Sequence, residues 1–100
     1  MKLREIAHSR TGDKGNISNI SVIAYEQKDY ERIREQVTEE RVREHFKSIV
    51  KGKVVRYEIP SIGALNFVLH DALGGGVTKT LSLDAHGKSL SSKMLELEIR

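Results

Sequence analysis

The sequence predicts an α+β fold in which a single mixed or antiparallel sheet carries helices on one face. Short segments in which apolar and polar residues alternate, as they do in half-buried strands, occur near both ends of the chain and in its middle. A segment with helical spacing of apolar residues, 29–50, lies between them. The predicted order is ββ-α(α)-β-α-ββ, and because no linker, repeat or low-complexity stretch interrupts it, we expect the 100 residues to form one domain.

The first two predicted strands flank the most polar segment of the chain. Residues 3–8 alternate between apolar and polar side chains, and residues 17–25 supply β-branched and aromatic bulk. Residues 8–16, with the sequence HSRTGDKGN, would form the loop between these strands. A third strand is predicted over residues 53–59 and ends at Pro60, because proline has no N–H group to donate to a ladder.

Two capping residues divide the helical segment. Asp29 precedes apolar residues at helical spacing, and Thr38 is followed by two glutamates, which suit the positive end of a helix. We therefore predict two short helices, or one helix with a break near Thr38, that end before Gly52.

A further helix is predicted over residues 62–73, with Ser61 as its cap and Gly74–Gly76 at its end. This segment is nearly apolar on every side, so we expect it to be buried. Its polar exceptions, Asn66 and His70, are four residues apart and would share one helix face.

The C-terminal part of the chain is predicted to form a hairpin. Residues 78–84 and 93–99 alternate as strands do, and residues 85–88 contain a glycine suited to the turn between them.

Composition excludes several classes of function. The chain has no cysteine, which rules out disulfides, a thiol nucleophile and thiolate metal sites. Its four histidines and its acidic residues show no metal-ligand spacing, so we expect neither a metal nor a cofactor. No stretch approaches the roughly 18 apolar residues of a membrane span, and the N-terminus lacks the apolar segment of a signal peptide. We therefore expect a cytoplasmic protein with no membrane partner.

The net charge of +3 does not by itself indicate a nucleic-acid partner. In residues 30–47, YERIREQVTEERVREHFK, basic residues alternate with acidic ones, which is typical of a solvated helix face. The chain has only five aromatic residues in 100, too few for a platform on which bases stack. We expect no nucleic-acid binding.

Residues 8–16 permit two interpretations, a surface turn or a ligand site. A turn needs the two glycines and little else, whereas a site would use the glycines to let backbone N–H groups converge on an anion, with nearby cations to bind it. The candidate ligand-binding residues are His8, Ser9, Arg10, Gly12, Lys14, Gly15, Asn16 and Asn66.

Asp13 and His70 are the candidate acid or base. The alternative for His70 and Asn66 is that both are core residues, each hydrogen-bonded to the backbone.

Three segments of the chain resemble the AtuA-like domain of the acyclic terpene utilisation family. They are AHSRTGDKGNISNISVIA at 7–24, YEIPSIGALNFVLHDALGGGVTKTLSLDAHGKSL at 57–90, and MLELEI at 94–99. In that family a similar module is usually the C-terminal, ferredoxin-like part of a larger protein. The resemblance implies a ferredoxin-like α+β sandwich and a setting of acyl-CoA or terpenoid-acid breakdown. The family's motif residues found here are His8, Ser9, Arg10, Gly12, Asp13, Lys14, Gly15, Gly63, Ala64, Asn66, His70 and Gly74–Gly76.

The resemblance favours a site at 8–16 and leaves three hypotheses for function. The first is an accessory subunit that binds a larger AtuA-like partner and contributes an anion-accepting loop to a shared site. The second is a small homo-oligomeric enzyme that acts on a carboxylate or CoA thioester, with His70 or Asp13 as acid or base. The third is a purely structural oligomerisation module. In each case we expect an oligomer, because so short a chain leaves an apolar face that another subunit would cover.

Overall fold

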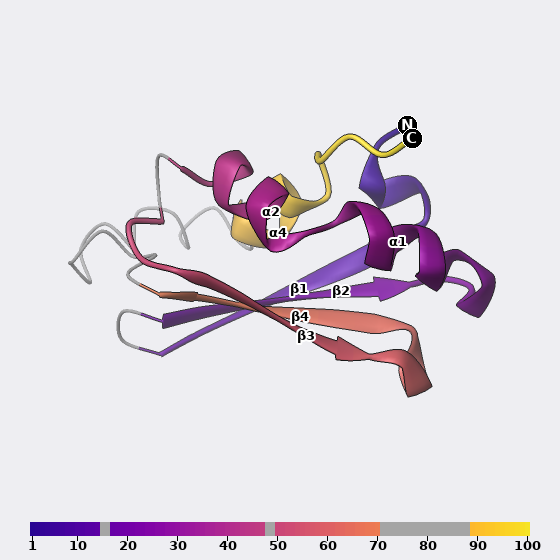
Figure 1. The fold of residues 1–100 in the computed structure, drawn as a ribbon, viewed down its shortest axis with the longest axis horizontal. Coiled ribbons are helices and arrows are strands. Elements are labelled where there is room, and N and C mark those ends of the chain that lie inside the picture. Colours follow the sequence, from indigo (N-terminus) through magenta and orange to yellow (C-terminus); the bar gives the residue numbers. More distant parts are fainter. Residues whose placement is uncertain (15–16, 48–49, 71–88) are drawn as a thin grey trace.

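The computed structural model describes residues 1–14, 17–47, 50–70 and 89–100, with only the backbone of Asp13, Lys14 and Ser89 (Figure 1). The strands are β1 (Ala7–Lys14), β2 (Ile17–Ala24), β3 (Val54–Ile59) and β4 (Ala64–His70), and the α-helices are α1 (Tyr30–Gln36), α2 (Glu39–His45) and α4 (Ser89–Met94). Single turns of 3-10 helix occupy Leu3–Glu5, Gln27–Asp29 and Pro60–Ile62.

The four strands that the structure describes form one antiparallel sheet with the order β1-β2-β4-β3, so among them β2 and β4 are central and β1 and β3 lie at the edges. The three α-helices of the described ranges lie together on one face of this sheet (Figure 1). The predicted fold class, an α+β sheet with helices on one face, is therefore confirmed.

Strand β4 occupies the segment for which the sequence predicted a buried helix, and that prediction is wrong. Leu65, Phe67 and Leu69 are buried, whereas the residues between them are only half-buried, which is the period of a strand. Because β4 is paired on both sides, its sequence is a nearly continuous run of apolar residues. The periodicity of such a run does not distinguish a strand from a buried helix. Gly63, at a φ of 65°, allows the tight reversal from β3 into β4.

Strand β1 extends through most of the segment 8–16 that was predicted to be a loop. Residues 3–5 form a 3-10 turn, and β1 then pairs with β2 without interruption from the Ala7–Ala24 pair to the Lys14–Ile17 pair. A polar segment can form an edge strand because the backbone ladder holds it, whatever its side chains are. Only residues 15–16 separate the two strands.

The two short helices predicted around Thr38 are confirmed. The Thr38 hydroxyl accepts a hydrogen bond of 3.2 Å from the Arg41 N–H, and so caps α2. Asp29 occupies the N-cap position of α1, although its side chain makes no capping hydrogen bond.

The C-terminal hairpin is contradicted where the structure describes it. Helix α4 and an extended tail replace the predicted strand 93–99, and the tail makes a single bridge between Glu98 and Lys2. The predicted strand 78–84, the turn 85–88 and Gly74–Gly76 lie outside the described residues. The described order is thus ββ-αα-ββ-α.

The core fills the space between the helices and the sheet. The central strands contribute Ile20, Val22, Leu65, Phe67 and Leu69, and the helical side contributes Ile33, Val37, Val42, Phe46, Leu90, Met94, Leu97 and Ile99. Within the described ranges, no helix has the length and hydropathy that crossing a bilayer requires.

Arg56 joins edge strand β3 to the helix layer. Its side chain is 17% exposed, and its Nη1 donates to the carbonyl oxygens of Arg34 and Val37, at 2.6 and 2.9 Å. These carbonyls belong to the C-terminal end of α1, where backbone acceptors lack partners within the helix. Its Nη2 also pairs with Glu58 at 3.0 Å.

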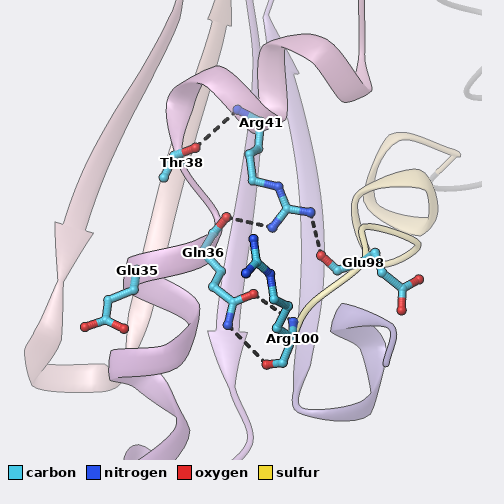
Figure 2. Close-up of a pocket in the computed structure, with 6 residues that line it drawn as sticks. All are labelled: Glu35, Gln36, Thr38, Arg41, Glu98 and Arg100. Carbon is cyan, nitrogen blue, oxygen red and sulfur yellow. Dashed lines mark hydrogen bonds between the residues drawn. The ribbon is translucent and has the colours of Figure 1, made fainter.

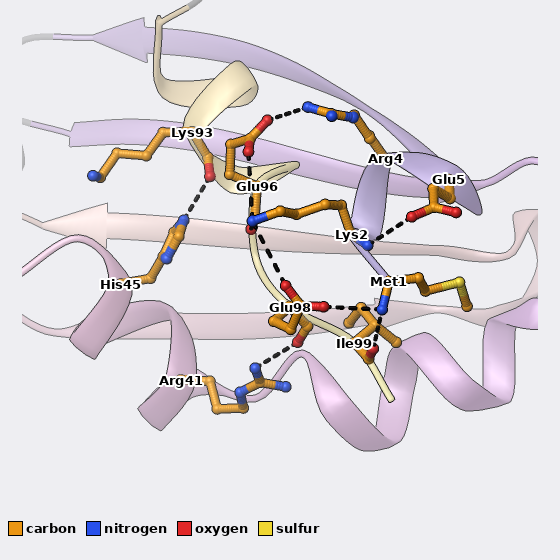
Figure 3. Close-up of polar contacts among 10 residues, drawn as sticks. All are labelled: Met1, Lys2, Arg4, Glu5, Arg41, His45, Lys93, Glu96, Glu98 and Ile99. Atoms are coloured by element: carbon orange, nitrogen blue, oxygen red, sulfur yellow. Dashed lines mark hydrogen bonds and ion pairs between the residues drawn. The ribbon is translucent and has the colours of Figure 1, made fainter.

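Polar contacts hold the two ends of the chain side by side (Figure 3). The Met1 ammonium donates to the Glu98 carboxylate at 2.9 Å and to the Ile99 carbonyl at 3.0 Å, and the Ile99 N–H returns a bond to the Met1 carbonyl. The hydrogen bond from this ammonium lowers the pKa of the Glu98 carboxyl. Nearby, His45 Nε2 lies 2.5 Å from the carbonyl oxygen of Lys93, which links α2 to α4.

Two glycines are expected to respond differently to alanine. A Cβ at Gly52 would lie 2.7 Å from the backbone oxygen of His70, whereas a Cβ at Gly12 would meet nothing within 4 Å. We expect Gly52→Ala to lower the free energy of unfolding by about 1–3 kcal/mol through overpacking. Gly12→Ala should leave it unchanged or raise it by up to about 1 kcal/mol. Urea denaturation measures both, and equal losses would contradict the close approach at Gly52.

A second prediction concerns Arg56. Arg56→Met keeps the apolar stem but removes the bonds to the α1 carbonyls, so it should cost about 2–3 kcal/mol of unfolding free energy. Arg43→Met, at an exposed position of α2, is the matched control and should change stability by less than about 0.5 kcal/mol. Denaturant titration of both variants would refute the role of Arg56 if they lost the same stability.

Candidate functional site

The candidate site lies on the face of the sheet opposite the helices, which we call the open face. Successive side chains of a strand point to opposite faces, and the buried members of each strand, apart from Ala64, face the helices. The open face is formed by the remaining positions: His8, Arg10, Gly12, Ile17, Asn19, Ser21, Ile23, Val55, Tyr57, Ile59, Ala64, Asn66, Val68 and His70.

The alternation along β1 divides the predicted site residues between the two faces. His8, Arg10 and Gly12 belong to the open face, whereas Ser9 and Thr11 face the helices, where their hydroxyl oxygens are buried and have no hydrogen-bond partner among the described residues. The β1 backbone pairs with β2, so its N–H groups do not converge on one point as the loop interpretation required. For Gly12 that interpretation is wrong.

The remaining residues of the segment are placed by register alone. Asp13 pairs with Ser18, which is buried on the helix side, and Lys14 pairs with Ile17 of the open face. Gly15 and Asn16 lie outside the described residues. His70 pairs with Ile17, whereas Asp13 pairs with Ser18. The two candidate acid or base residues therefore occupy different rows, a row being the set of residues in register across the strands.

The open face carries a row of four polar side chains that crosses every strand. Arg10 is in register with Ser21, Ser21 with Asn66, and Asn66 with Tyr57. We call these residues the polar row. Ser21 and Asn66 are half-buried in its centre, and Arg10 and Tyr57 are exposed at its ends. Asn66 Nδ2 also donates a long hydrogen bond of 3.4 Å to Asn19 Oδ1 of the adjacent row.

Arg10 is the unneutralised charge of this row. It makes no hydrogen bond or ion pair with any residue that the structure describes, and none of the residues that form the open face is acidic. A guanidinium group in this situation can offer two parallel N–H donors to one carboxylate. The polar row therefore has the chemistry of an anion acceptor with neutral hydrogen-bonding groups beside it.

Apolar side chains flank the polar row on both sides. Ile23, Ala64 and Ile59 form the row on one side, and Val68 and Val55 belong to the row on the other. At the corner of the face, the rings of His8 and Tyr25 stack with centroids 5.4 Å apart and an interplanar angle of 27°. The open face thus combines a cation, neutral polar groups and hydrocarbon.

Sequence reasoning found Arg10, Asn66 and His8 but missed Ser21, Asn19 and Tyr57. Each of these lies in a segment that was correctly predicted to be a strand, 17–25 or 53–59. The strand period alone would have placed Ser21 and Asn19 on one face. Bringing them beside Asn66 needed the pairing of β2 with β4, which the helix prediction for residues 62–73 concealed.

A pocket of about 540 Å³ on the helix side is a second candidate (Figure 2). It is lined by Glu35, Gln36, Thr38, Arg41, Glu98 and Arg100. Most of its polar groups already have partners within the chain. Arg41 donates to the carbonyls of Gln36 and Glu98 at 3.1 and 2.6 Å. The Gln36 side-chain amide donates to the Arg100 carbonyl and accepts from the Arg100 N–H. This pocket fastens the C-terminal tail, and it is a weaker candidate than the open face.

No set of three or more histidine and carboxylate side chains gathers as metal ligands in the part of the chain that the structure describes.

Comparison with known proteins identifies the family. No curated protein and no solved structure matches the chain. The family model of the AtuA ferredoxin-like domain matches residues 1–100, the whole of the sequence. The described fold, an antiparallel sheet of four strands with helices on one face, agrees with a ferredoxin-like domain. The chain therefore belongs to the AtuA ferredoxin-like domain family.

Proposed function

We propose that this chain is a binding module, an accessory subunit that contributes an anion-accepting surface centred on Arg10 to a site shared with another chain. The observation that carries the proposal is the polar row, which places a free guanidinium, a hydroxyl, an amide and a phenol in register on a face whose described side chains include no acidic one. A larger AtuA-like subunit or a second copy of this chain would supply the rest of the site.

The dimensions of the polar row favour an elongated ligand. Neighbouring strands are about 4.8 Å apart, so the row from Arg10 to Tyr57 spans roughly 14 Å. A carboxylate, or a phosphate group of CoA, would occupy only one end of the row at Arg10. The body of the ligand would then lie over Ser21 and Asn66, beside the apolar side chains of Ile23 and Ala64. A carboxylic acid or CoA ester with a hydrocarbon chain has this combination of groups, in keeping with the acyl-CoA or terpenoid-acid setting that the family resemblance implies.

The exposure of the face explains why the site would be shared. Small-molecule sites bury about 70–90% of their ligand, and one face of a sheet covers only one side of it. Arg10 and Tyr57 are exposed, Tyr57 at 54%, so a ligand bound to them would stay open to solvent without a second surface.

The alternative, an enzyme with His70 or Asp13 as acid or base, receives less support from the geometry. The two residues lie in different rows, and His70 is in register with the apolar Ile17. A general base needs its orienting partner within hydrogen-bond reach, and none of the residues that form the open face is a carboxylate to orient His70.

Removal of the Arg10 guanidinium should abolish most of the binding of an acyl carboxylate. We expect Arg10→Ala to weaken the binding of hexanoate and of hexanoyl-CoA by about tenfold or more, the loss that corresponds to a charge-assisted hydrogen bond. Stability should change little, because an exposed arginine contributes only about 0–1 kcal/mol. Titration of the backbone amides of isotope-labelled protein by NMR measures the affinity and shows whether shifts concentrate in β1, β2 and β4.

Arg43→Ala, which removes the same charge from the opposite side of the molecule, is the matched control and should bind both probes as the parent does. Arg10→Lys should recover only part of the affinity, because lysine cannot make the bidentate contact. A parent that binds neither probe at millimolar concentration, or an Arg10→Ala variant that binds like the parent, contradicts the proposal.

A further inference from the structure

We propose that the open face is covered by a second copy of this chain, in a face-to-face dimer whose two-fold axis runs parallel to the strands. Strand β1 of one copy then lies over β3 of its partner. This inference deepens the proposed function and rests on it for the role of Arg10 as anion acceptor, because the partner copy completes that site.

The exposed apolar side chains show which surface needs a cover. The structure describes six large hydrophobic side chains as exposed, and Ile17, Tyr57 and Ile59 of these lie on the open face. Tyr25, at 62% exposure, stacks against His8 at the corner of the same face. Apolar groups gathered on one face of a small domain are typical of a subunit interface.

The distribution of charge selects the axis. Arg10 and His8 lie on edge strand β1, and Tyr57 and Ile59 lie on the opposite edge, β3. A two-fold axis running across the strands would place β1 over the β1 of the partner, so that the two Arg10 side chains would approach each other. An axis parallel to the strands instead sends the two Arg10 side chains to opposite rims, roughly 14 Å apart. Like charges then avoid each other.

The same axis brings complementary side chains into contact. Rotation about this axis keeps each row at the same position along the strands and reverses the order of its residues. Arg10 therefore faces the partner's Tyr57, and Ser21 faces the partner's Asn66. Packed sheets lie about 10 Å apart and cross at about 30°, a gap and an offset that these side chains can span. Arg10 gains the face of an aromatic ring, and Ser21 and Asn66 gain hydrogen-bond partners in the buried centre.

The sizes of the neighbouring side chains also fit. Gly12 faces the partner's Val55, and nothing lies within 4 Å of the space where a Gly12 side chain would stand. Ile23 faces the partner's Ala64. In each pair a large side chain meets a small one, as interdigitated sheets require.

The dimer would complete two equivalent anion sites, one at each rim. Because the partner then covers Ser21 and Asn66, the body of a ligand held at Arg10 would extend outward along the rim, in place of the course across the row that a single copy would allow. The ring of the partner's Tyr57 would stack on the Arg10 guanidinium and leave its N–H edge free for a carboxylate, while the phenol adds a further donor. Within one chain, Arg10 and Tyr57 are separated by three strand spacings, about 14 Å, and cannot make this contact.

An exchange of the two facing residues tests this geometry. Sedimentation equilibrium should give the parent twice the 11.3 kDa mass of the chain. Arg10→Tyr alone and Tyr57→Arg alone should each weaken dimerisation by about tenfold or more, since each replaces a cation and ring pair with two like groups. The double variant, Arg10→Tyr with Tyr57→Arg, restores the pair in reverse and should dimerise within about threefold of the parent.

Arg43→Tyr is the matched control and should dimerise as the parent does, and circular dichroism confirms that every variant is folded. A parent that stays monomeric from micromolar to millimolar concentration overturns the inference, and so does a double variant no better than the single ones. The hexanoate titration separates the two proposals. A monomeric parent whose binding depends on Arg10 refutes only the dimer, and a dimer whose binding ignores Arg10 refutes only the anion site.

Discussion

The apolar layer of the two central strands is the constraint on which the rest of the structure depends. Each α-helix described here has only six or seven residues, far below the roughly 12–15 that give an isolated helix even marginal stability in water. The helices therefore persist because their apolar sides pack on Ile20, Val22, Leu65, Phe67 and Leu69. Since strand side chains alternate, committing these positions to the core commits their neighbours to the other face.

Two arginines illustrate how that alternation separates side chains that are used within the fold from side chains that have no described partner. Arg56 faces the helices, where carbonyl groups of α1 and the Glu58 carboxylate use its donors. Arg10 faces the other way on the opposite edge strand, and no described residue uses its donors. The face on which a charged side chain falls thus decides whether its donors are used within the fold, and the polar segment near the N-terminus presents only one half of its residues on the open face.

The sequence could predict α1, α2, β2 and β3, because capping residues and a clear period mark them, and it could predict the family. It could not predict β4, where central burial removes the contrast that periodicity needs, or the length of β1, which pairing with β2 stabilises in spite of its polar side chains. The alternation of Leu95, Leu97 and Ile99 predicted a strand, but these residues belong to the C-terminal tail. The residues directly before the tail form helix α4. Arg10 and Asn66 were identified as candidates, but their arrangement in one row required the register of four strands.

The hydrogen bonds between Met1 and Ile99 fix both ends of the chain at one corner of the molecule, on the helix side of the sheet (Figure 1). Any carrier joined to either end would be attached at that corner. Such a tether would leave the opposite surface of the sheet unobstructed, so the module could be genetically fused, immobilised or labelled at its ends while its open face stays accessible.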